Sequence, residues 1–115
     1  MKHLIIQHFG PIKHVDLDIK QFNFFIGPQS SGKSTIAKVI STCMWVEKEV
    51  ATTMDETIVA TAVDFENLLI HFHRMYDYFY TDTMINYESE VVSILYQDKK
   101  IRITLKSKDL YERVK

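Results

Sequence analysis

The chain has 115 residues, of which 46% are apolar and 25% charged, as is typical of one small globular domain with its own core. A formal net charge of −1 does not indicate a nucleic-acid-binding protein, and the single cysteine, Cys43, excludes an internal disulfide bond. The apolar runs are far shorter than the ~20 residues of a membrane-spanning helix. We therefore expect one domain over residues 1–115, in a reducing, cytoplasmic setting and without a membrane partner.

The N-terminal part of the chain reads as two short strands and a turn. Leu4-Ile5-Ile6 is an apolar run, and His8-Phe9-Gly10-Pro11 has the composition of a turn. Apolar and acidic residues then alternate from Val15 to Ile19, which is typical of a strand with one buried face. The two strands are close enough in sequence to form an antiparallel hairpin. A third, buried strand is predicted over Asn23–Ile26.

A glycine-rich loop follows this third strand. Residues 27–34 have the pattern Gly-x-x-x-x-Gly-Lys-Ser, and a segment with helical periodicity comes next. The order of strand, loop and helix is that of a phosphate-binding P-loop. Gly27 and Gly32 allow the backbone to approach a ligand closely, and the helix directs the positive end of its dipole at the phosphates.

The residues of this loop can be assigned to parts of a nucleoside triphosphate bound with Mg²⁺. Backbone N–H groups from about Ser30 to Thr35, including those of Ser31 and Gly32, can surround the phosphates as a nest. Lys33 would contact the β and γ phosphates, and the Ser34 hydroxyl would be the Mg²⁺ ligand. Thr35 could reach the α phosphate. The sequence thus predicts ATP and Mg²⁺ as ligands of residues 27–35.

Two segments with helical periodicity follow the loop. The first predicts a helix over about residues 33–51, from the spacing of Ile36, Val39, Ile40, Cys43, Met44 and Val50. Thr53 and Glu56 have the spacing of a capping box, which indicates a break. A second stripe predicts one or two helices to about Tyr80, ended by Thr81-Asp82-Thr83, and consists of Ile58, Ala62, Phe65, Leu69, Phe72, Tyr76 and Phe79.

The aromatic residues near the end of this stripe have two interpretations. They are Phe72, Tyr76, Tyr78, Phe79 and Tyr80. Aromatic rings can form a platform on which bases stack. Packing of the second helical segment on the sheet, or on a partner lobe, is the simpler interpretation and the one we favour.

The C-terminal part is predicted to be an antiparallel hairpin and a short helix. Glu90–Tyr96 and Ile101–Lys106 read as strands joined by Gln97–Lys100, within a hairpin subregion over residues 86–106. A further helix is predicted over Asp109–Val114. Residues 91–115 carry seven basic and three acidic groups, so the basic segment 99–115 could contact DNA; a solvated hairpin face is the alternative.

Residues 4–35 resemble the start of an ABC-type ATPase head, most closely that of the RecF/SMC/OLD-like bacterial ATPases labelled AAA. Residues 4–13 follow the I-x-N-F-G-P-I pattern of these proteins, and the loop resembles their G-P-N-x-S-G-K-S-T. His8 and Gln29 stand where that pattern has asparagine. The later hairpin is similar to their antiparallel β-subdomain. The expected fold is therefore α/β and P-loop NTPase-like: a partial head with a mixed sheet, a P-loop helix, a further helix and an antiparallel β-hairpin.

This resemblance also implies binding partners, a biological role and residues near the base and ribose. In such heads ATP lies between two heads, so a second head in a homodimer, or a C-terminal lobe, is the implied partner. A role in DNA repair or phage defence is implied with it. Gln7, His8 and Lys13 lie where such heads approach adenine and ribose, although a plain surface turn remains the alternative.

The catalytic elements of these heads are not identifiable in the chain. A strand ending in Asp-Glu, a signature motif and a switch histidine are all missing from the pattern, so no catalytic residue is assigned. We therefore expect this chain alone to bind ATP weakly or not detectably and to turn it over negligibly, because hydrolysis also needs an oriented water. A P-loop small-molecule kinase and a non-catalytic interaction or oligomerisation module remain as alternative functions.

Overall fold

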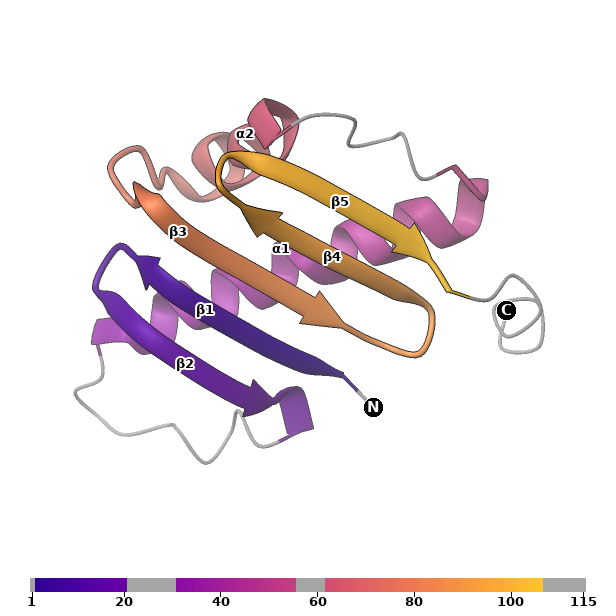
Figure 1. The fold of residues 1–115 in the computed structure, drawn as a ribbon, viewed down its shortest axis with the longest axis horizontal. Coiled ribbons are helices and arrows are strands. Elements are labelled where there is room, and N and C mark those ends of the chain that lie inside the picture. The colour runs from indigo at the N-terminus through magenta and orange to yellow at the C-terminus, as the bar shows by residue number, and fades with distance from the viewer. Residues whose placement is uncertain (1, 21–30, 56–61, 107–115) are drawn as a thin grey trace.

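A computed structural model describes residues 2–20, 31–55 and 62–106, which form an antiparallel sheet with two helices on one of its faces (Figure 1). The strands are arranged in the order β2-β1-β3-β4-β5. In chain order the elements are β1 (His3–Phe9), β2 (Ile12–Asp18), α1 (Ser31–Thr53), α2 (Ala62–His73), β3 (Phe79–Glu88), β4 (Val92–Gln97) and β5 (Lys100–Leu105).

The first two strands form the predicted antiparallel hairpin. Leu4 lies opposite Leu17, and Phe9 lies opposite Ile12 at the turn. Gly10 in this turn has a φ of +54°, and its N–H donates to the carbonyl oxygen of Tyr78 at 2.8 Å. The predicted third strand, Asn23–Ile26, lies outside the described residues.

Helix α1 confirms the prediction of a helix after the glycine-rich loop, with two further residues at each end. Its inward face carries Val39, Cys43, Val46 and Val50, which are fully buried. The helix ends as expected near Thr53, whose hydroxyl donates to the carbonyl oxygen of Glu49. Met54 then has a φ of +58°, the left-handed conformation that commonly ends a helix. Glu56, the other half of the predicted capping box, lies outside the described residues.

The prediction of helix as far as Tyr80 is wrong. Helix α2 ends at His73, Arg74 follows with a φ of +58°, and the chain enters β3 at Phe79. Thr81-Asp82-Thr83 is therefore part of a strand and does not separate helix from strand. This unpredicted strand takes the central position of the sheet, between β1 and β4.

The predicted C-terminal hairpin is confirmed as β4 and β5. Gln97 pairs with Lys100, so the turn consists of Asp98 and Lys99, both of which have positive φ. This is the arrangement of a two-residue hairpin turn. All strand pairs among the described residues are antiparallel, so the prediction of a mixed sheet is not met in this part of the chain. The predicted helix over Asp109–Val114 lies outside the described residues.

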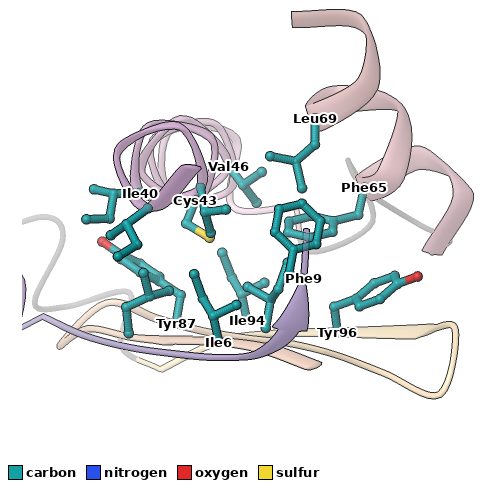
Figure 2. Close-up of a cluster of buried hydrophobic side chains, with 14 of the residues drawn as sticks. Ile6, Phe9, Ile40, Cys43, Val46, Phe65, Leu69, Tyr87, Ile94 and Tyr96 are labelled. Carbon is teal, nitrogen blue, oxygen red and sulfur yellow. The ribbon is translucent and has the colours of Figure 1, made fainter. Parts of the chain in front are cut away.

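The core fills the layer between the helices and the sheet (Figure 2). Ile6, Tyr87 and Ile94 point from the strands toward Cys43 and Val46 of α1. Phe65 and Leu69 of α2 cover the adjoining part of the sheet beside Phe9 and Tyr96. No described element covers the opposite face of the sheet. None of the described helices is long and apolar enough to cross a membrane.

Candidate functional site

The N-terminal end of α1 is the part of the predicted phosphate site that the structure describes. The helix begins at Ser31, inside the glycine-rich motif, and has no acidic residue in its first turn. The N–H groups of a first helical turn have no partner within the helix, and the helix dipole makes this end electropositive. Lys33 adds a positive charge at this end of the helix, where the helix dipole already attracts anions. This end of α1 therefore fits a phosphate group.

The side chains of Lys33, Ser34 and Thr35, in the first turn of α1, differ in their exposure to solvent. Thr35 is only 3% exposed, whereas Ser34 is exposed and Lys33 is half-buried. Ser34 and Lys33 are thus accessible to a ligand in solution, whereas Thr35 is buried in the first turn of the helix. Gly27 and Ser30 lie outside the described residues, as do the side chains of Ser31 and Gly32. The roles assigned to these residues from the sequence remain predictions.

The β1–β2 turn lies at the same end of the molecule as the start of α1 (Figure 1). Beside this turn is an open pocket of about 460 Å³, lined by Gln7, His8, Lys13, His14 and Asp82. The structure therefore brings together the three residues that the sequence placed near adenine and ribose. Gln7 pairs with His14 across the hairpin and points to the sheet face away from α1, because its neighbour Ile6 is buried beneath the helices.

His8 is held in this pocket by three contacts with β3. Its Nδ1 contacts a carboxylate oxygen of Asp82, and its ring stacks on Tyr80 with 4.1 Å between ring centroids and 12° between planes. Thr83 donates its hydroxyl hydrogen to the His8 carbonyl oxygen and accepts a hydrogen bond from the Tyr80 N–H at 2.8 Å. The imidazole thus has a fixed position at the mouth of the pocket.

The backbone of His8 is in a strained conformation. Its φ is +51°, and the pairing of β1 with β3 is irregular between Gln7 and Phe9. Asparagine, aspartate and histidine are the residues other than glycine that adopt this conformation most readily. This explains how histidine can stand where the resembling ATPases have asparagine. Strain of this kind often occurs at functional sites, and bulges often lie beside them.

A second pocket lies between the helices. It has a volume of about 300 Å³ and is lined by Ser41, Thr42, Trp45, Leu68, Phe72 and His73. Trp45 and Phe72 are 42% and 66% exposed, and their ring centroids are 6.3 Å apart. The aromatic cluster was predicted to pack on the sheet or on a partner lobe, and packing within the domain is found for only part of it. Phe79 and Tyr78 pack against the core, whereas Phe72 and Tyr76 are exposed.

The family model for the AAA ATPase domain matches residues 1–113, nearly the whole chain. The chain belongs to this family. No curated protein and no solved structure matches it. Membership of the AAA ATPase domain family supports a nucleotide-binding, ATPase-type function, and the helix end at Ser31 is the described feature that fits the phosphates of a nucleotide.

Two residues of the AAA ATPase domain were missed by the sequence reasoning. Asp82 lines the pocket at the β1–β2 turn, and Tyr80 stacks on His8, which also lines it. From the sequence, both were assigned to the end of a helix. The signal that could have found them is the alternation of Thr83, Ile85 and Tyr87, which is typical of a strand. A strand there, beside β1, would have placed Asp82 near His8.

Proposed function

We propose that this domain binds ATP with Mg²⁺ through residues 27–35, as the N-terminal part of a larger ATPase of the RecF/SMC/OLD-like type. The observation that carries the proposal is the start of α1 within the Gly-Lys-Ser motif, with Lys33 in a first turn free of acidic residues. Lys33 would contact the β and γ phosphates, and Ser34 would coordinate Mg²⁺. Bound Mg²⁺ would neutralise phosphate charge. His8 and Lys13 would receive the base and ribose, whereas Gln7 lies on the sheet face away from α1.

The proposal is tested by titrating the purified chain with MgATP in a calorimeter. We expect weak binding that Lys33→Ala removes, because the phosphates lose their cationic partner. Lys48→Ala is the matched control, since Lys48 is an exposed lysine of the same helix beyond its first turns. Equal binding by the parent chain and Lys33→Ala would contradict the proposal, as would the absence of any binding by the parent chain.

We further propose that hydrolysis needs residues supplied from outside this chain. The phosphate-binding elements stabilise charge, but phosphoryl transfer to water also needs an oriented nucleophile. The expected result is negligible release of phosphate from MgATP by the chain alone. A Lys33-dependent turnover in the range of ordinary enzymes would overturn this part of the proposal, and phosphorylation of a nucleoside or metabolite by the chain would favour a small-molecule kinase.

The exposed apolar side chains on the outer side of the helices support docking against a further lobe or a second head. Met44, Trp45 and Phe72 are each at least 40% exposed. Apolar groups gathered on a surface are typical of interaction sites. Light scattering with and without MgATP measures the association. Phe72→Glu should reduce association and leave nucleotide binding intact; unchanged association would assign the contact to another surface.

A DNA contact by the basic C-terminal segment is proposed on charge. Lys99, Lys100 and Arg102 are exposed around the β4–β5 turn, and residues 107–115 lie outside the described residues. DNA binding through these groups should weaken steeply with salt. The measurement is fluorescence anisotropy of a labelled duplex at two salt concentrations, with Lys99→Glu as the variant. Binding that Lys99→Glu leaves unchanged would exclude the β4–β5 turn as the DNA contact.

A further inference from the structure

We propose that Asp82 is a positioning residue that makes the nucleotide site prefer adenine, because it fixes which nitrogen of His8 carries the hydrogen. This inference rests on the proposed function, in which the base lies beside His8. It assigns a role to β3, which the glycine-rich motif does not include.

The first step is the hydrogen-bond polarity of the His8 ring. A carboxylate only accepts hydrogen bonds, so the contact between Asp82 and Nδ1 places the hydrogen on Nδ1. In the neutral ring Nε2 then has a lone pair and accepts. The His8 side chain is 47% exposed and lines the open pocket, so Nε2 is the ring nitrogen left for a ligand.

The second step is the rigidity of this arrangement. The stacked ring of Tyr80 covers one face of the imidazole, and Thr83 holds the His8 carbonyl. Tyr80 is itself tied to the β1–β2 turn, since its hydroxyl donates to the carbonyl oxygen of Gly10 at 3.4 Å. The ring of His8 therefore cannot turn over to exchange its two nitrogens without breaking contacts with β3.

The third step is the chemistry of the purine edge. Adenine carries an amino group at its six-position, which donates, whereas guanine and hypoxanthine carry a carbonyl oxygen there, which accepts. An accepting Nε2 forms a hydrogen bond with the amino group and faces the carbonyl oxygen with no hydrogen between them. A pair of facing acceptors leaves both groups unsatisfied, which is unfavourable once water is displaced.

The test compares the dissociation constants of MgATP and MgITP, two nucleotides that share ribose and phosphates and differ at this edge of the base. We expect the parent chain to prefer ATP by about tenfold, the discrimination typical of one hydrogen bond against an unsatisfied group. Asp82→Asn should bring the two constants to within about twofold, since an amide can either donate to or accept from Nδ1. Asp82 is an exposed side chain, so this variant should keep its fold.

Two further variants separate the explanations. Asp98→Asn removes the same charge from an exposed turn that does not line this pocket, and it should keep the full preference. His8→Asn suits the left-handed backbone and offers both a donor and an acceptor, so it should lose the preference. Lys33→Ala should weaken both nucleotides by the same factor.

The results distinguish failure of the inference from failure of the proposed function. Binding of both nucleotides without preference, or a preference that Asp82→Asn keeps, would overturn the role of Asp82 and leave the phosphate site standing. Binding of neither nucleotide by the parent chain would overturn both proposals. A preference lost in Asp82→Asn and His8→Asn but kept in Asp98→Asn would support the inference.

Discussion

The hydroxyl of Tyr87 on β3 donates a hydrogen bond to Oε1 of Glu47 on α1 at 2.8 Å. The other carboxylate oxygen of Glu47 accepts from the Ser89 hydroxyl, and Nζ of Lys2 lies 3.5 Å from Oε1. Glu47 is only 9% exposed, so this charge is acceptable in the core because each oxygen has partners. Burial, together with the Glu47 carboxylate, raises the pKa of Tyr87, so the hydroxyl remains protonated and donates.

Tyr87→Phe should lower the free energy of unfolding by about 1–2 kcal/mol, because Glu47 loses a buried donor. The change is measured by urea denaturation. Tyr76→Phe is the matched control: this tyrosine is 64% exposed, and removing its hydroxyl should change stability by less than about 0.5 kcal/mol. Equal effects of the two substitutions would show that the buried hydrogen bond does not stabilise the helix on the sheet.

Gly10→Ala should destabilise the β1–β2 turn. The new Cβ would lie 2.3 Å from Cδ2 of Tyr78, and the φ of +54° would remain unfavourable for alanine. We expect a loss of about 1–3 kcal/mol in thermal or urea unfolding. In a Tyr78→Ala background the clash disappears, so the same glycine substitution should cost less there. A cost that is independent of Tyr78 would assign the whole effect to the backbone.

The stability of the domain should fall as the pH rises from 6.5 through the raised, folded pKa of His3. The Asp18 carboxylate lies 2.8 Å from Nδ1 and, with Asp16 at Nε2, raises the pKa of His3 above the 6.5 of an unperturbed histidine. The folded state thus favours the protonated ring. Its contribution is fully present below the unfolded pKa and is lost as the pH rises through the folded pKa. Urea unfolding curves recorded at pH values across this range measure the change in the free energy of unfolding.

Replacement of His3 by asparagine should flatten this decline of stability with pH, whereas His14→Asn, on the exposed side of the same hairpin, should leave the decline in place.

His73 should act in the opposite sense. Burial, with Lys38 nearby, lowers the pKa of His73, so the folded state favours its neutral form. Its contribution is present above 6.5 and is lost as the pH falls through the lower, folded pKa. His73→Asn should therefore reduce the loss of stability in acid.

Trp45 is the only tryptophan of the chain and reports on the surface between the helices. It is 42% exposed and its ring is tilted at 56° to that of Phe72. Acrylamide should quench its fluorescence readily, and Phe72→Ala should increase the quenching because one side of the indole becomes open. Protection of Trp45 that rises with protein concentration would indicate that this surface is buried between copies.

The sequence predicted those elements whose periodicity and boundary residues agree. Helix α1 follows a glycine-rich loop and has apolar residues at helical spacing, so its position was predicted within two residues at each end. The β1–β2 and β4–β5 hairpins have alternating patterns and clear turns. Met44, however, was placed on the buried stripe and is 40% exposed, because the stripe on α1 is narrower than the spacing suggested.

Strand β3 was missed because nothing in the sequence marks the end of α2. The helical spacing of Phe65, Leu69, Phe72 and Tyr76 continues past the true end at His73, and the chain turns at Arg74 with a positive φ without a glycine or proline. Tertiary packing decides this boundary, since Met75 is buried while Phe72 and Tyr76 are exposed. The pocket at the β1–β2 turn was therefore predicted only on its β1 and β2 side.

The position of β3 beside β1 has a consequence for how the domain folds. Phe9 pairs with Phe79, so the chain must close a loop containing both helices before the middle of the sheet exists. Closing such a long loop costs more entropy than closing either local hairpin, and contacts between distant residues slow folding. A nascent chain ending after α1 would have its first hairpin and helix α1 but no central strand. The proposed nucleotide site should therefore be complete only after β3 has left the ribosome.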